Sequence, residues 1–150
     1  MKQRIRIHKA EPNKGVADFS HLLDAPAGKR GFVRVRDGHF YFEDGTRTRF
    51  LGFNMAARSN TPDHETAEKM AARFASMGVN IIRLHAADAP IGEEPCTWSS
   101  CKEAPLLDYE SGNSLEFNKE GLDRFDYFVA KLREKGIYLH IDLLVARAFN

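Results

Sequence analysis

The strongest constraint on the fold is a pattern that occurs twice: a stripe of apolar residues at helical spacing, a single glycine, and a short run of bulky apolar residues. In the first copy, Gly78 is followed by residues 79–85, which read Val-Asn-Ile-Ile-Arg-Leu-His. In the second, Gly136 is followed by a similar run at 137–144. Glycine commonly ends helices because it tolerates the left-handed conformation of a C-terminal cap. The apolar runs alternate little with polar residues, which is typical of parallel strands covered on both faces.

The two helices are predicted at 62–77 and 119–135. The tripeptide Thr61-Pro62-Asp63 offers a capping threonine, a proline at the first helical position and an acid in the first turn. Asn118 is the corresponding cap of the second helix. The apolar stripes consist of Ala67, Met70, Ala71, Phe74 and Met77 in the first helix, and of Leu122, Phe125, Val129 and Leu132 in the second.

A further strand at 49–54 precedes the first helix, which completes a β-α-β-α-β pattern and predicts a parallel α/β unit. Upstream, residues 32–53 alternate with a period of two and contain Asp-Gly at 37–38 and 44–45, where the chain is expected to reverse. This alternation predicts an antiparallel β-meander that leads into the α/β unit.

The chain divides into an arm and the first part of a larger domain. Residues 1–30 are polar and broken by proline and glycine, so we expect an irregular arm, anchored by Phe19, Leu22 and Leu23. Residues 31–150 are predicted to form the meander and an incomplete parallel sheet. A (β/α)8 barrel normally takes about 250 residues, so the rest of the domain is expected beyond Asn150. Otherwise another chain must cover the edges of the outer strands.

Composition and charge argue against several classes of function. The formal net charge is +1 at pH 7 and the basic residues are dispersed, which disfavours a nucleic-acid partner. No apolar run is long enough to cross a membrane, and no signal-peptide core follows the basic start. Cys96 and Cys101 are too few for a zinc site, and both a local disulfide and free thiols fit their spacing. No metal or cofactor site is predicted.

The candidate site lies where the predicted strands end. Ligands of parallel α/β folds bind at the carboxyl ends of the strands, so Asn54, Arg83, His85 and the segment after Asp142 are expected to share one rim. The connection from His85 to Asn118 is long for such a fold and carries Trp98. We interpret this connection as a wall of a binding cleft.

Several segments together resemble the start of cellulase-like glycoside hydrolases, the enzymes of family 5 and their relatives among the (β/α)8 barrels. The resemblance covers most of the chain from about Ser20 onward, and the order and spacing of the segments carry it. The segments are 22–29 (LLDAPAGK), 31–40 (GFVRVRDGHF), 43–46 (EDGT), 50–54 (FLGFN), 78–85 (GVNIIRLH), 122–126 (LDRFD) and 136–138 (GIY).

The resemblance implies a fold and a chemistry. The fold is the opening β-α-β-α-β portion of a (β/α)8 (TIM) barrel, preceded by an N-terminal antiparallel β-meander. The chemistry is retaining hydrolysis of β-linked oligo- or polysaccharides by two glutamates, whose carboxyl groups stand about 5 Å apart. In the family these glutamates end the fourth and seventh strands. They are therefore expected beyond Asn150, and this segment alone is expected to be inactive.

The resemblance also gives Arg83 a role, because it matches the second-strand arginine that braces the nucleophile carboxylate. We expect its side chain to be largely shielded from water, near Asn54 or His85, and short of a carboxylate partner within this chain. Where many relatives have a histidine facing the sugar, the third strand here reads Asp142-Leu143-Leu144. Asp142 can be a rim carboxylate or a hydrogen-bond partner behind the site, although a structural role is favoured. His140 is interpreted as a buried polar group.

Each predicted substrate-binding residue also has an interpretation without a ligand. Arg83 can form a structural ion pair, since a buried arginine needs a carboxylate. His85 can bond to its own loop, and Asn54 can simply form a turn. Trp98 can anchor its loop, although aromatic faces also stack against sugars.

Another class of function fits the sequence as well. The chain can be a non-catalytic carbohydrate-binding or scaffold piece that associates with a partner chain or another copy. A metal-dependent barrel enzyme is disfavoured, because Asn54, Arg83 and His85 make a poor ligand set. An Asn-Glu pair at the end of a buried strand downstream of Asn150 would distinguish the hydrolase from the binding piece.

Overall fold

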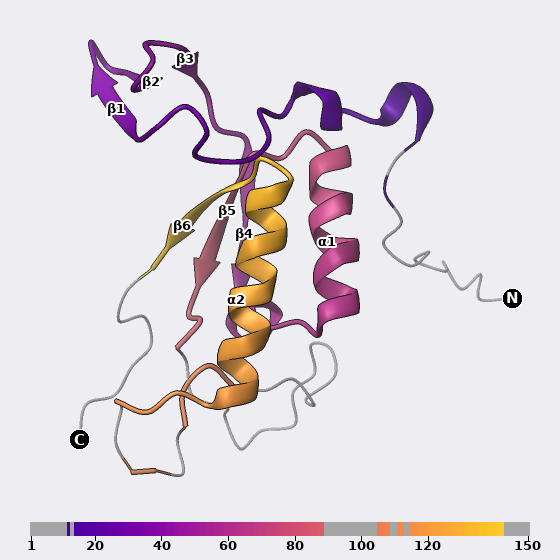
Figure 1. Ribbon diagram of the computed structural model, residues 1–150, viewed down its shortest axis with the longest axis vertical. Coiled ribbons are helices and arrows are strands. Elements are labelled where there is room, and N and C mark those ends of the chain that lie inside the picture. Colours follow the sequence, from indigo (N-terminus) through magenta and orange to yellow (C-terminus); the bar gives the residue numbers. More distant parts are fainter. Residues whose placement is uncertain (1–11, 13, 89–104, 109–110, 113–114, 143–150) are drawn as a thin grey trace, which may run out of the picture.

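The fold is mixed α/β, with two helices and two small sheets (Figure 1). The computed structural model describes residues 12, 14–88, 105–108, 111–112 and 115–142. The antiparallel sheet contains β1 (Val33–Arg36), β2 (His39–Phe42) and β3 (Arg47–Thr48). The parallel sheet contains β4 (Gly52–Ala56), β5 (Ile81–His85) and β6 (Tyr138–Ile141), and the helices are α1 (His64–Ser76) and α2 (Lys119–Glu134). Within the described residues, no helix is both long and apolar enough to cross a bilayer.

The predicted β-α-β-α-β unit is confirmed as β4-α1-β5-α2-β6. Its strands lie in the order β4-β5-β6, with β5 paired in parallel to both neighbours. The register aligns Asn54 with Arg83, and Arg83 with His140. All three strands therefore end at the same edge of the sheet.

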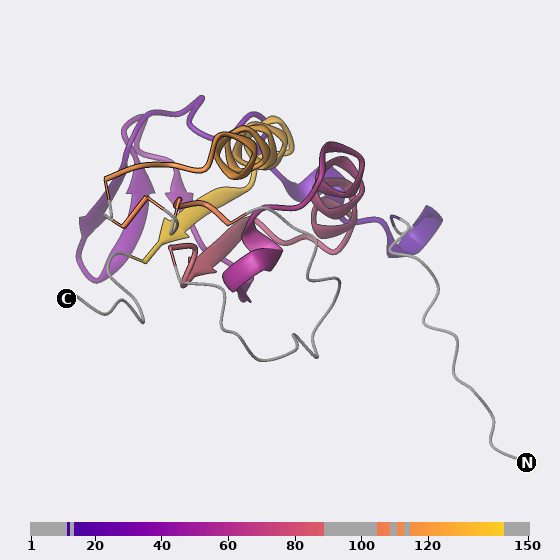
Figure 2. The same cartoon turned by 90° about the horizontal axis from the view of Figure 1, so that it is seen from below.

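Both helices lie on one face of the parallel sheet (Figure 2). Ile82 and Leu84 are fully buried on that face, whereas the intervening Arg83 is exposed. The expectation of two covered faces is thus wrong for the described elements. The sequence misled because Ile81, an apolar residue, shares the other face with Arg83 and His85, which hides the alternation.

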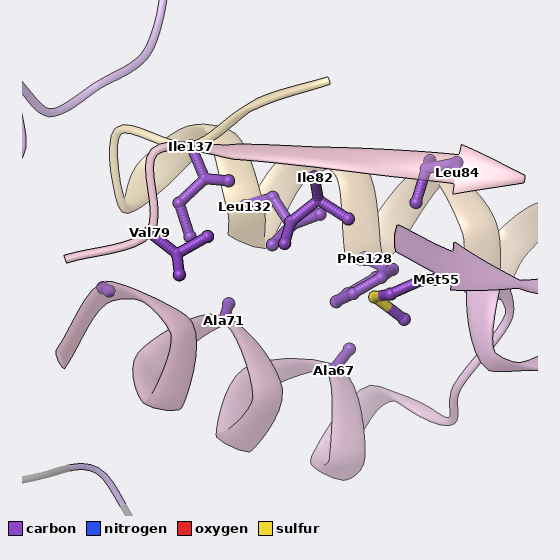
Figure 3. Close-up of a cluster of buried hydrophobic side chains, with 10 residues drawn as sticks. Met55, Ala67, Ala71, Val79, Ile82, Leu84, Phe128, Leu132 and Ile137 are labelled. Atoms are coloured by element: carbon purple, nitrogen blue, oxygen red, sulfur yellow. The ribbon is translucent and has the colours of Figure 1, made fainter. Parts of the chain in front are cut away.

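The core lies between the parallel sheet and the helices (Figure 3). It consists of Met55, Ala67, Ala71, Ala75, Val79, Ile82, Leu84, Phe128, Leu132 and Ile137. The alanines of α1 have small side chains, which leaves room for Phe128 of α2 beside Met55 (Figure 3). The predicted stripes are right for Ala67, Ala71 and Leu132. They are wrong for Met77, which is exposed, and they omit the fully buried Phe128.

The ends of the helices follow local chemistry. Asp63, rather than Thr61, caps α1, because its carboxylate accepts the Thr66 N–H at 2.7 Å. Asn118 caps α2 as predicted, accepting the Gly121 N–H at 2.9 Å. Gly78 and Gly136 follow the helices with positive φ values of 75° and 82°, which confirms their predicted role.

The antiparallel meander is confirmed for its first two strands. Residues 37 and 38 both have positive φ, as a two-residue type I′ hairpin turn requires. The third strand is shorter than predicted, since β3 ends at Thr48 and the chain then leaves this sheet to form β4. The meander lies at the amino-terminal end of the parallel strands, where Phe42 stacks on Tyr138.

The described part of the arm crosses the same amino-terminal end. The Phe19 N–H donates to the Ser76 carbonyl at 3.0 Å, and the Ala27 N–H donates to the Arg133 carbonyl at 2.9 Å. Leu23 packs against the core as predicted, whereas Leu22 is exposed. The arm is therefore held mainly by backbone hydrogen bonds to the ends of both helices.

Replacing Phe128 with alanine tests the core. The side chain is fully buried, so Phe128→Ala should lower the free energy of unfolding by about 3–5 kcal/mol. The exposed Phe32 is the matched control, and Phe32→Ala should change it by no more than about 0.5 kcal/mol. Urea unfolding of both variants measures the difference. Equal losses would contradict the described core.

Candidate functional site

The candidate site lies at the carboxyl ends of the parallel strands, on the face opposite the helices. Arg83 and His85 of β5 point to this face because Ile82 and Leu84 occupy the core. Asp142 directly follows β6, and its N–H donates to the Leu84 carbonyl at 3.2 Å. This bond continues the parallel pairing by one residue and brings Asp142 beside His85.

Asp142 is the centre of a polar cluster, which we call the Asp142 cluster and define as Arg83, His85 and Asp142. Nε of Arg83 donates to Oδ1 of Asp142 at 3.1 Å, and an Nη donates to Oδ2 at 2.5 Å. Two parallel bonds of this kind match the planar guanidinium to the planar carboxylate. Nδ1 of His85 lies 2.6 Å from the same Oδ2. One carboxylate thus holds two cationic or polar side chains from the neighbouring strand.

The cluster is buried at its centre and open at its edge. The Asp142 side chain is 10% exposed, against 44% for Arg83 and 34% for His85. The Arg83 guanidinium, helped by His85, lowers the pKa of Asp142 from 3.8 to about 2. Asp142 is therefore an anion at any pH near neutrality, with both oxygens engaged.

A buried asparagine fixes the backbone beneath the cluster. Nδ2 of Asn60, in the short 3-10 helix η3 (Ala57–Asn60), donates to the His85 carbonyl at 3.0 Å. Asn60 is fully buried, and its Oδ1 has no hydrogen-bond partner among the described residues. The end of β5 is thus tied to the turn that follows β4.

The structure brings together only part of the predicted site. Arg83 and His85 meet through Asp142. Asn54 lies beside Arg83 in the sheet, and its exposed side chain forms no hydrogen bond to the described residues. Trp98 lies outside the described residues.

Three expectations about the rim are corrected. Arg83 is not largely shielded from water, and it is not short of a carboxylate, because the strand register supplies Asp142. His140 is exposed rather than buried, with Nε2 3.7 Å from Oδ1 of Asp142. Sequence reasoning left Asp142 out of the site. The available signal was its position just after an apolar run, which is the same signal that singled out His85.

Comparisons of the chain with protein-family models, with curated proteins and with solved structures found no match. Among the described residues, no three His, Cys, Asp or Glu side chains gather in a way that could hold a metal ion.

The first prediction from the site concerns the titration of Asp142. Carboxyl-carbon NMR should show a midpoint near 2, because Arg83 and His85 favour the anion. Arg83→Lys should raise this midpoint towards 3.8, since an ammonium group cannot form the two parallel bonds. Arg34→Lys is the control, because Arg34 pairs with Glu43 in the other sheet and should leave the Asp142 midpoint unchanged. A midpoint near 3.8 in the unmodified chain would refute the cluster.

The second prediction from the site concerns the stability of the fold at acid pH. Because the pKa of Asp142 is lower in the folded chain, its pairing stabilises the fold fully above the unfolded value and is lost as pH falls through about 2. Asp142→Asn should therefore unfold more easily than the parent chain at pH 5, with a gap that narrows towards pH about 2. Unfolding free energies across this pH range measure the gap. A constant gap would show that Asp142 acts through packing alone.

Proposed function

We propose that the chain is the N-terminal segment of a glycoside hydrolase with a (β/α)8 barrel. In this proposal β4, β5 and β6 are the first three barrel strands, and α1 and α2 belong to the outer ring of helices. The enzyme cleaves β-linked oligo- or polysaccharides with retention, using two glutamates supplied by later strands.

One observation carries the proposal: the Asp142 cluster lies at the carboxyl ends of parallel strands, on the face away from the helices. In (β/α)8 barrels the helices cover the outside, and active sites lie at the carboxyl ends of the strands. The cluster occupies the position that such an active site requires. The resemblance of the sequence to cellulase-like enzymes supports the same assignment.

The side chains at this rim suit a sugar site. Arg83 has five N–H donors, and its bonds to Asp142 engage only two of them. The remaining donors can hold a second carboxylate, which in this proposal is the nucleophile. Asn54 is exposed beside Arg83 and offers an amide to a sugar hydroxyl. Retaining hydrolysis then needs two glutamates, about 5 Å apart, close to Asn54 and Arg83.

A second candidate is a non-catalytic carbohydrate-binding or scaffold piece completed by a partner chain. It draws support from the outer edges of β4 and β6, which pair with no other strand among the described residues. Ile141 of β6 and Leu51, just before β4, are also exposed. Open edges of this kind readily accept another strand.

Activity assays separate the two candidates. The 150-residue chain should show no turnover on β-glucan, mannan or aryl glycosides, since it lacks both glutamates of the proposed mechanism. The longer protein that this proposal implies should hydrolyse one of them. Its sequence should place an Asn-Glu pair at the end of a later strand. Turnover by the short chain would refute the placement of both glutamates beyond Asn150. An inactive longer protein without such a pair would refute the hydrolase.

In the longer protein, Arg83→Lys should lower kcat by about 10²-fold, because it removes preorganised donors beside the nucleophile. Its melting temperature should change little, since Arg83 is half-exposed. Arg34→Lys, at an exposed pair in the meander, is the matched control and should preserve both quantities. Loss of stability with full activity in the folded fraction would make Arg83 a structural residue.

A further inference from the structure

The two ring nitrogens of His85 have different surroundings. Nδ1 lies 2.6 Å from Oδ2 of Asp142, whereas Nε2 has no hydrogen-bond partner among the described residues. An ionised carboxylate only accepts hydrogen bonds, so Nδ1 must carry the proton in this contact. In the neutral ring, the lone pair then stands on Nε2.

Arg83 orients His85 indirectly, through Asp142. Its two bonds hold the Asp142 carboxylate in one plane, and the carboxylate in turn holds the His85 ring. The Asp142 side chain is 10% exposed and the His85 side chain 34% exposed. The carboxylate that fixes the ring is therefore better shielded from water than the histidine that carries the basic nitrogen. A base oriented by a third group is the arrangement that proton-accepting histidines use.

The backbone of His85 is also fixed. Its carbonyl accepts from the buried Asn60, and its Cα lies opposite Ala56 of β4. Neither the ring nor the strand end has to reorganise before a ligand binds, which is what a precise hydrogen-bond acceptor needs.

We propose that His85 and Asp142 form a carboxylate–histidine dyad in which Nε2 of His85 accepts a hydrogen bond from a ligand hydroxyl group. Asp142 is a positioning residue that sets the tautomer, and Arg83 positions Asp142. A lone pair on Nε2 accepts only from a donor, so the ligand is a molecule that carries a hydroxyl group able to donate to it. Its identity as a β-linked glycan rests on the proposed function, whereas the tautomer does not.

Long-range 1H–15N NMR on the 150-residue chain tests the dyad, at a pH about two units above the ordinary histidine pKa of about 6.5. His85 should carry its proton on Nδ1. His64 is an internal control, because it contacts Asp123 through Nε2 at 2.9 Å and should carry its proton there. Asp142→Asn should move the His85 proton to Nε2, since an amide can donate to Nδ1. Asp142→Glu should restore Nδ1–H, and Asp123→Asn should leave His85 unchanged. A proton on Nε2 of His85 in the parent chain would overturn the dyad.

A titration with cello- and manno-oligosaccharides then tests the ligand. Binding should shift the Nε2 resonance of His85, and His85→Phe should weaken binding about tenfold, the size of one hydrogen bond. His85→Gln should recover part of the loss, because its carbonyl also accepts. Equal affinity of the parent and His85→Phe would overturn the role of His85 and leave the proposed function standing. No binding by the parent, with the Nδ1–H tautomer present, would overturn the glycan assignment and leave the dyad standing.

Discussion

Burial of Ile82 and Leu84 against the two helices determines where every group of the candidate site lies. Successive side chains of a strand point to opposite faces, so placing these two residues in the core turns Arg83 and His85 to the other face. Because β5 is the central strand, its register also decides which residues of β4 and β6 stand beside them. The hydrophobic core thus fixes the geometry of a polar cluster on the opposite face of the sheet.

The core and the cluster contribute differently to the molecule. Full burial of one side chain such as Ile82 or Leu84 stabilises the fold by about 1.5–3 kcal/mol. An ion pair with an exposed partner, such as the 44% exposed Arg83, contributes only about 0–1 kcal/mol. Burial of apolar side chains therefore dominates the stability of the fold. The main effect of the Asp142 cluster is to orient the side chains of Arg83 and His85. Asn60 adds to that orientation by holding the end of β5 through the His85 carbonyl.

The sequence predicted the helix ends, which depend on local chemistry. It did not predict which side chains of different strands pair with each other. Gly78, Gly136 and Asn118 were predicted because each acts on its immediate neighbours. The cap of α1 was predicted too early in the chain, at Thr61, because Thr61 and Asp63 both suit a cap. Ile81 and the aromatic Tyr138 lie on the same face of the sheet as Arg83. The sequence therefore predicted helices or other cover on both faces, whereas the described helices cover only one. The pairing of Arg83 with Asp142 depends on strand register across 59 positions, and no pattern within either strand specifies it.

The central claim is that the register of β6 on β5 places Asp142 between Arg83 and His85. A slip of one residue would turn the side chains of β6 to the opposite face. Scalar couplings across hydrogen bonds measure this register directly by NMR. The structure predicts a coupling from the Asp142 amide nitrogen to the Leu84 carbonyl carbon, and one from Tyr138 to Asn80. Couplings from Asp142 to a different residue of β5 would contradict the account.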